Sequence, residues 1–203
     1  MSPPKAIVFD LGKVLLDFDY SIAARRIAAK ASYRGDLYQF FTVHSELLMR
    51  YETGLVTSAE FFAAICRATG FTGSYEEFAS YFGDIFSEIP PMVSFQARVR
   101  KAGFRTYIFS NTNEIAIEHI RQVFPFYGAF DGYIYSYEVR SMKPDRKIYD
   151  AMEAMAGSRG DEILYIDDRG ENVEGGRRQG WRSILHETPE RTIAQAAGLG
   201  VAT

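Results

Sequence analysis

The chain has 203 residues, of which 47% are hydrophobic and 24% charged, enough for one α/β domain with a small subdomain. The net charge is −3, and Lys and Arg residues are scattered singly or in pairs, which argues against nucleic acid as a partner. The single cysteine, Cys66, excludes an internal disulfide. With no signal-peptide core and no apolar run that could span a bilayer, we expect a cytoplasmic protein without a membrane partner.

The first predicted element is a strand over residues 6–10 (AIVFD). Its β-branched and aromatic residues form a continuous apolar run that ends in a carboxylate, Asp10, and is followed by Leu-Gly. Such a run is typical of a buried strand in a parallel sheet, where Asp10 would open the loop at the strand's end.

A helical segment follows, because the stretch from residue 20 to residue 88 has no strand pattern. Four helices are predicted, over residues 21–31, 35–51, 58–69 and 75–87. Thr57 or Ser58 and a capping box from Ser74 to Glu77 mark helix starts, and Pro90 closes the segment. We therefore expect a helical cap over residues 19–89, inserted into a core made of residues 1–18 and 90–203, with residues 11–19 and 89–91 as linkers.

Strand and helix patterns alternate through the rest of the chain. Strands are predicted over residues 105–110, 133–136, 162–168 and 183–185, and helices over residues 91–102, 113–123, 145–156 and 170–179. Gly103, Gly157 and Gly180 stand at or just beyond helix ends, where glycine is favoured. The alternation predicts a doubly wound α/β fold with a parallel sheet.

Polar residues end several of the predicted strands. They are Asp10, Ser110 with Asn111, and Asp167 with Asp168, while Lys143 follows the third strand of the core. Ligands of open α/β sheets bind outside the carboxyl ends of the strands. Three carboxylates gathered there would repel one another by about 4 kcal/mol per pair at ~4 Å and an effective dielectric of ~20, so a cation is expected among them.

Four motifs in this order resemble the haloacid dehalogenase-like superfamily, and the resemblance covers essentially the whole chain. The motifs are residues 8–14 (VFDLGKV), 109–113 (FSNTN), 143–145 (KPD) and 166–175 (IDDRGENVEG). The helical insertion after the first strand matches the family's cap. The YSYEV sequence before Lys143 resembles the branch that contains sugar-phosphate phosphatases, so the resemblance implies a phosphohydrolase acting on a small phosphorylated metabolite.

The resemblance also implies roles for individual residues. Asp10 would be the nucleophile that forms an aspartyl-phosphate, while Lys143 and the Ser110 hydroxyl would hold the transferring oxygens. Backbone N–H groups at Leu11 and Asn111 would complete the phosphate cradle.

Mg²⁺ is the expected cofactor, since a hard cation prefers oxygen ligands and leaves room for phosphate. By resemblance, its ligands would be the Asp10 carboxylate, the Gly12 carbonyl and the Asp168 carboxylate. Asp167 would be a further ligand or an outer partner. Asn172 would orient the acidic loop.

Gly12 departs from the family pattern, because phosphatases of the superfamily usually carry an acid–base Asp at this position. Side-chain proton transfer worth roughly 10²–10⁴-fold in rate is missing there. Asp17 or Asp19 could supply the proton, the substrate could have a good leaving group, or the fold could bind a phosphorylated ligand or a partner with little turnover. The sequence leaves open which of these three explanations accounts for Gly12.

A 2-haloacid dehalogenase is the rival enzyme, since that branch uses the same aspartate without a metal. It fits less well, because the branch has an aromatic residue where Gly12 stands and lacks the pair Asp167 and Asp168. A mutase is disfavoured for want of the acid–base Asp.

Specificity is expected to come from the cap, which can close over the sheet edge. Arg50, Tyr51 and Glu52, before Gly54, are the candidate specificity residues, whereas the aromatic residues of the cap recur at helical spacing and are expected to form its core. The three histidines, His44, His119 and His186, lack a metal-ligand spacing and are assigned no role. The sequence does not determine the substrate or the oligomeric state.

Overall fold

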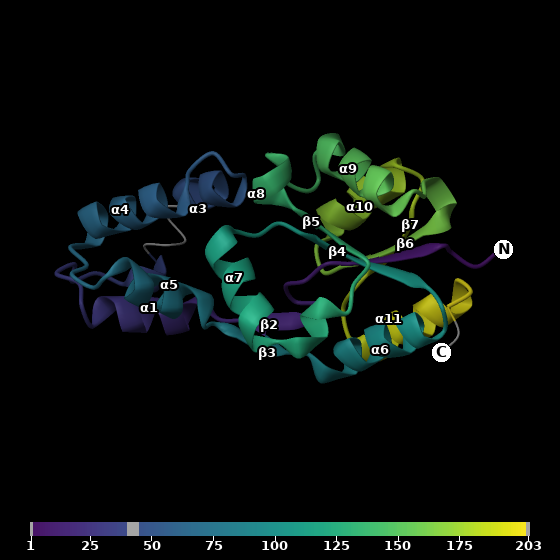
Figure 1. Ribbon diagram of the computed structural model, residues 1–203, viewed down its shortest axis with the longest axis horizontal. Helices are drawn as coiled ribbons and strands as arrows, with labels where there is room; N and C mark the ends of the chain where they lie inside the picture. The colour runs from purple at the N-terminus through teal and green to yellow at the C-terminus, as the bar shows by residue number, and fades with distance from the viewer. Residues whose placement is uncertain (1, 40–44, 202–203) are drawn as a thin grey trace.

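A computed structural model describes residues 2–39 and 45–201 of the chain, and its centre is a parallel five-stranded sheet (Figure 1). The strand order is β5-β4-β1-β6-β7, and every neighbouring pair is parallel. The strands are β1 (Ala6–Phe9), β4 (Arg105–Ser110), β5 (Gly132–Tyr135), β6 (Ile163–Asp167) and β7 (Arg182–Leu185). The order reverses at β1, as in doubly wound folds, so the predicted fold class is confirmed.

Helices cover both faces of this sheet. Figure 1 shows α9 and α10 on one side and α6 and α11 on the other. The helices of the core are α6 (Pro90–Lys101), α7 (Glu114–Val123), α8 (Ser136–Val139), α9 (Arg146–Ala156), α10 (Gly170–Arg178) and α11 (Pro189–Gly198), with short 3-10 turns at Pro125–Gly128 and Gly160–Glu162. The sequence interpretation did not include α11.

The continuous apolar character of β1 follows from this double cover. Ile7 and Phe9 pack with residues of α6, α7 and α11, whereas Ala6 and Val8 pack with residues of α9 on the opposite face. All four side chains are fully buried. Alternate residues of a strand point to opposite faces, so a strand covered on both faces needs apolar residues throughout.

A separate helical body lies beyond one end of the sheet (Figure 1). It contains α1 (Tyr20–Ala28), α3 (Ser45–Glu52), α4 (Ser58–Thr69) and α5 (Tyr75–Gly83) around an aromatic cluster that includes Phe61, Phe78 and Phe82. The capping box predicted from Ser74 to Glu77 is confirmed at the start of α5. Of the two residues predicted to start α4, Thr57 is the N-cap, and it also forms a capping box with Glu60. Because α7 also contributes Ile115 to this cluster, the helical body is packed directly on the core.

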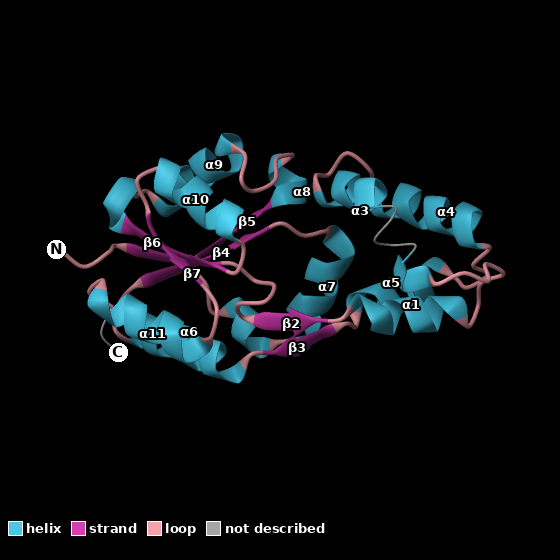
Figure 2. Ribbon diagram, turned by 180° about the vertical axis from the view of Figure 1, so that it is seen from behind, coloured by secondary structure: helices cyan, strands magenta, loops and turns pink. Residues whose placement is uncertain are grey.

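The connection between the two parts differs from the prediction. Residues 16–18 and 86–88 were expected to lie in a linker and at the end of a helix, but they form β2 (Leu16–Phe18) and β3 (Phe86–Glu88), an antiparallel pair. Figure 2 shows this pair between the sheet and the helical body. Helix 75–87 was therefore predicted too long, since α5 ends at Gly83. The predicted helix 35–51 is helical at residues 37–39 and 45–51, and its middle lies outside the described residues.

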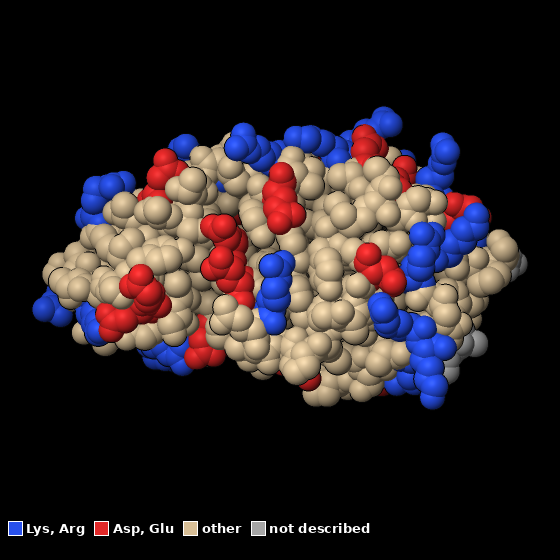
Figure 3. Space-filling model, viewed as in Figure 1, with Lys and Arg blue, Asp and Glu red and all other residues tan. Residues whose placement is uncertain are grey.

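Both ends of the chain lie at the end of the molecule opposite the helical body (Figure 1). On the face drawn in Figure 3, basic and acidic side chains are both spread over the surface. Within the described ranges, 2–39 and 45–201, no helix is both long and apolar enough to cross a membrane.

Candidate active site

The carboxyl ends of β1, β4 and β6 bring the predicted polar residues together. Asp10 follows β1 and is 7% exposed, and its backbone N–H donates to the carbonyl of Ile166 on β6 at 2.9 Å. The Asp10 Oδ1 atom accepts a hydrogen bond from the Leu11 N–H at 2.7 Å. Asp167, the last residue of β6, is fully buried. Regular parallel pairing thus fixes two carboxylates side by side at the sheet edge.

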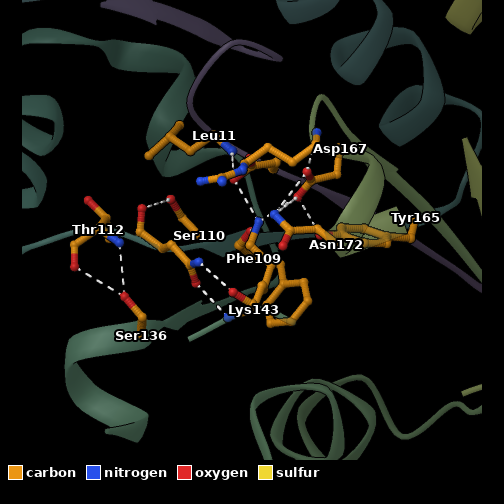
Figure 4. A network of polar contacts seen from close by, with 12 residues as sticks. Leu11, Phe109, Ser110, Thr112, Ser136, Lys143, Tyr165, Asp167 and Asn172 are labelled. Atoms are coloured by element: carbon orange, nitrogen blue, oxygen red, sulfur yellow. Dashed lines mark hydrogen bonds and ion pairs between the residues drawn. The ribbon is translucent and has the colours of Figure 1, made fainter. Parts of the chain in front are cut away.

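Lys143 lies between these carboxylates. Its Nζ is 3.0 Å from Asp10 Oδ1 and 2.7 Å from Asp167 Oδ2, and it donates to the carbonyl of Phe109 at 2.8 Å (Figure 4). The Lys143 side chain is 1% exposed. Because the ammonium group is buried and has these three partners, its position is fixed, and it places a positive charge beside Asp10.

The Asn111 side chain holds the backbone of Lys143. Its Oδ1 accepts from the Lys143 N–H at 2.8 Å, and its Nδ2 donates to the Lys143 carbonyl at 3.0 Å. The sequence had predicted only a backbone role for Asn111, because a side-chain contact across 32 residues leaves no local signal. Asn111 therefore determines where the loop that carries Lys143 meets the end of β4.

The two carboxylates of the acidic pair have different surroundings. Asp167 accepts hydrogen bonds from the Tyr165 hydroxyl, from the Arg169 N–H at 2.8 Å and from Asn172 Nδ2 at 3.1 and 3.2 Å, in addition to Lys143. Asp168 is only partly buried. A carboxylate with this many donors is an orienting group, whereas Asp168 retains oxygens for a ligand.

The pKa values of the three carboxyl groups and of Lys143 are shifted from their usual ranges. Burial and the neighbouring acids raise the pKa of Asp10 above its usual range, although Lys143 opposes the shift, and burial and Asp167 likewise raise the pKa of Asp168. Burial would lower the pKa of Lys143, but the charges of Asp10 and Asp167 outweigh it and raise that pKa. Burial would raise the pKa of Asp167, but Lys143 and its other donors hold it below the usual range.

The donor set fits a divalent cation. Carboxylate oxygens of Asp10, Asp167 and Asp168 all lie within 4.8 Å of one another. Three carboxylates and one ammonium leave two negative charges when all are ionised, which a cation such as Mg²⁺ would neutralise. The buried Asn172 Oδ1 has no hydrogen-bond partner among the described residues, so a further oxygen donor is available at this place. Hard cations take such all-oxygen sets.

A cavity of about 260 Å³ opens at this edge of the sheet. On the core side it is lined by Asp10, Gly12, Asn111, Lys143, Asp168 and Asn172. The helical body and β2 supply Phe18, Tyr20, Leu48 and Glu52, with Lys13 and Arg169 also in the lining. A smaller adjoining cavity includes Ser110, Leu11 and again Glu52. The space suits a small polar metabolite.

Some residues singled out from the sequence do not reach this cavity. Asp17 is exposed and ion-paired with Lys13, and Asp19 caps α1 by accepting from the Ser21 N–H at 2.8 Å. Arg50 is exposed. The Tyr51 side chain is buried, with its hydroxyl 2.7 Å from Ser58 Oγ.

Of the three cap residues named from the sequence, Glu52 alone lines the cavity. His44 lies outside the described residues. His119 is 3.8 Å from Asp84, and His186 is 2.8 Å from Thr192, and neither lines the cavity.

Comparison with known families gives a match over residues 4–180 to the haloacid dehalogenase-like hydrolase model. The chain belongs to the haloacid dehalogenase-like hydrolases. The match to the family model confirms the resemblance found in the sequence, and a solved HAD family enzyme has the same fold.

Among curated proteins, a D-ribitol-5-phosphate phosphatase of Bacteroides thetaiotaomicron is 26% identical over 194 residues, covering 90% of this chain and 92% of that protein. A predicted HAD-like family hydrolase of Porphyromonas gingivalis has a similar structure, with a TM-score of 0.83, 24% identity and full coverage of both chains. A HAD family enzyme of B. thetaiotaomicron, as an Asp-to-Ala mutant in complex with magnesium and inorganic phosphate, gives a TM-score of 0.78 at 22% identity, covering 91% and 96% of the two chains.

An L-2-haloacid dehalogenase of Xanthobacter autotrophicus is more distant. Its TM-score is 0.63 at 18% identity, with 98% of this chain and 85% of that chain covered.

Proposed function

We propose that this protein is a Mg²⁺-dependent phosphomonoester hydrolase for a small phosphorylated metabolite, with Asp10 as the nucleophile. One observation carries the proposal: Asp10, Asp168 and Lys143 line a single cavity, and the Lys143 Nζ is 3.0 Å from Asp10 Oδ1. A carboxylate beside a fixed ammonium and a further acidic group is what in-line phosphoryl transfer requires. The curated relative that hydrolyses a polyol phosphate supports the same chemistry.

The reaction has two steps in this proposal. An oxygen of Asp10 bonds to phosphorus while the bond from phosphorus to the ester oxygen breaks. Water then attacks the aspartyl-phosphate, which releases phosphate and restores the Asp10 carboxylate. Lys143 and the Ser110 hydroxyl would hold the transferring oxygens, together with the N–H groups of Leu11 and Asn111. Mg²⁺ held by Asp10, the Gly12 carbonyl and Asp168 would neutralise charge on the phosphoryl group.

The substrate we propose is a sugar or polyol phosphate. A cavity of about 260 Å³ suits a ligand of that size, and its lining mixes carboxylates, ammonium groups and amides with Phe18 and Tyr20. We further propose that residues 19–89 act as a cap over the site, because Tyr20, Leu48 and Glu52 line the cavity from that side. In the core, residues 1–18 and 90–203 would supply the phosphate chemistry.

We expect purified protein to hydrolyse p-nitrophenyl phosphate and a panel of sugar and polyol phosphates, including D-ribitol 5-phosphate, only with Mg²⁺ present. Removal of the metal with EDTA should abolish turnover, and re-addition should restore it. Phosphate release is the measurement. Phosphate release that persists in EDTA would contradict the Mg²⁺ requirement, and halide release from 2-haloacids without metal would replace this proposal with the dehalogenase. A complete absence of turnover would favour a phosphate-binding protein.

Asp168→Asn should weaken Mg²⁺ binding more than Asp167→Asn does. Asp168 has free carboxylate oxygens for a ligand, whereas Asp167 is already bonded to Lys143, Tyr165 and Asn172. Loss of an outer partner costs about 10–100-fold in metal affinity, which is the most we expect for Asp167→Asn. The Mg²⁺ concentration for half-maximal activity should rise further than that in Asp168→Asn. Asp167→Asn should also lower the melting temperature. Equal Mg²⁺ requirements in both variants would contradict the assignment.

A further inference from the structure

The proposed reaction needs a proton donor that Gly12 does not provide. A Cβ atom at Gly12 would lie 3.0 Å from Cε1 of Phe18, a tight contact that the Phe18 side chain would have to relieve by shifting a few tenths of an ångström. Asp17 and Asp19, the nearest acids in sequence, lie outside the cavity lining. Hydrogen bonds from Lys13 and from Ser21 also hold the pKa values of Asp17 and Asp19, respectively, below their usual range. Neither is suited to deliver a proton at neutral pH.

Glu52 is the acidic side chain that the helical body brings to the reaction site. It is the last residue of α3 and lines both the cavity that contains Asp10 and the adjoining cavity that contains Ser110. We propose, on the basis of the phosphohydrolase function, that Glu52 replaces the missing aspartate as the general acid and base of the reaction.

The core fixes the position of Glu52. The Ser136 Oγ atom accepts from the Thr112 N–H at 2.9 Å (Figure 4). It also donates to the Glu52 carbonyl at 2.5 Å, which joins the end of α3 to the loop after β4. Gly54, at φ +69°, makes a second close contact, since a Cβ there would lie 2.1 Å from the carbonyl oxygen of Tyr137. A catalytic group has to be held within a fraction of an ångström, and these contacts hold its backbone.

The environment of the Glu52 carboxyl is suited to proton transfer. Burial raises its pKa to about 7, and the opposing charge of Arg169 limits the shift. Tyr20 of α1 is a neighbouring titratable hydroxyl, whose pKa is raised by burial and, to a lesser extent, by the Glu52 charge. Lys13, Lys143, Asp10 and Asp168 line the same cavity. A group that is half ionised near pH 7 can act as an acid in one step and as a base in the next.

The proton balance closes over one turnover. As the bond from phosphorus to the ester oxygen breaks, protonated Glu52 gives its proton to that oxygen, and the product leaves as a neutral alcohol. The Glu52 carboxylate then takes a proton from the water that attacks phosphorus in the aspartyl-phosphate. Phosphate departs, the Asp10 carboxylate is restored, and Glu52 is again protonated.

Glu52→Gln tests this role, with Glu46→Gln on the exposed start of α3 as the matched control. Gln keeps the shape of the side chain but cannot exchange a proton. With D-ribitol 5-phosphate, a poor alkoxide leaving group, we expect kcat/KM to fall by roughly 10²–10⁴-fold. p-Nitrophenolate leaves without a proton, so rapid mixing should give a burst of one nitrophenolate per active site, followed by slow turnover as the aspartyl-phosphate accumulates.

The alternatives give different results. Equal losses with both substrates and no burst would mean a structural role, and activity equal to that of Glu46→Gln would mean none; either result would overturn the assignment of Glu52. If the wild-type protein hydrolyses neither substrate, or hydrolyses them equally well after Asp10→Asn, the proposed phosphohydrolase function itself is wrong. Carboxyl NMR of the metal-free protein gives a readout without turnover, in which Glu52 should titrate near pH 7. A titration near pH 4 would contradict the assignment.

Discussion

Replacing Asp10 by Asn should lower the rate of turnover by roughly 10⁴-fold or more, because the amide cannot form the acyl-phosphate bond. The expected losses hold for every substrate, whatever its leaving group, which distinguishes this variant from Glu52→Gln. Steady-state phosphate release measures the effect. Acid quenching after mixing with ³²P-labelled substrate should give labelled wild-type protein and no label on the variant.

The fold should survive this change. The Asn side-chain oxygen can still accept from the Leu11 N–H, and Lys143 keeps its partner Asp167. Since burial raises the pKa of Asp10, the ionised carboxylate is unfavourable there, and we expect the variant to be at least as stable as wild type in metal-free buffer. Asp150→Asn, at an exposed site on α9, is the control. A variant that retains more than about a tenth of wild-type activity would exclude Asp10 as the nucleophile.

The sequence predicted the sheet edge because the physics there is local and repetitive. Apolar runs that end in Asp10, Ser110 and Asp167 must be parallel strands, and the carboxyl ends of parallel strands share an edge. Lys143 was grouped with them because it follows the third strand, and its predicted role on the phosphate came from the family resemblance. Its buried position between Asp10 and Asp167, held by Asn111, is a tertiary contact that no spacing in the sequence indicates.

The β2–β3 pair could not be predicted in the same way. Each strand has three residues, and the two lie about seventy positions apart, so neither gives a period-two signal of useful length. Phe86 also continues the four-residue spacing of Phe78 and Phe82, which is a helical spacing, so the predicted helix was extended beyond the end of α5.

The sequence also could not predict which of the three candidate specificity residues faces the cavity. Arg50, Tyr51 and Glu52 are consecutive, and they were named together because nothing in the sequence reports which way each one faces. Successive residues of a helix are rotated by about 100° from one another, so only the packing of α3 on the core assigns them. Arg50 is exposed, Tyr51 enters the aromatic cluster, and Glu52 enters the cavity.

Lys143→Met should destabilise the metal-free protein strongly, by roughly 3–5 kcal/mol, in addition to abolishing activity. Its side chain is 1% exposed and its ammonium is shared by Asp10 and Asp167, of which Asp167 is fully buried. Methionine fills a similar volume, but it leaves two carboxylates without their cation, and breaking a buried pair from one side has costs of this size. Urea unfolding at pH 7 in EDTA is the measurement. Lys147→Met, on the exposed start of α9, should change stability little.

The deficit should shrink as the pH falls from 7 to 5. In wild type, Lys143 and other donors hold the pKa of Asp167 below its usual range, so this carboxylate contributes stability at neutral pH that is lost only in strong acid. Burial already raises the pKa of Asp10 in wild type, and without the ammonium it raises that of Asp167 above the unfolded value of about 4 as well. The folded variant therefore takes up one proton more than the wild type does, and it gains stability relative to wild type as the pH falls. A deficit that stays constant over this range would mean that lost packing, and not unpaired charge, causes the destabilisation.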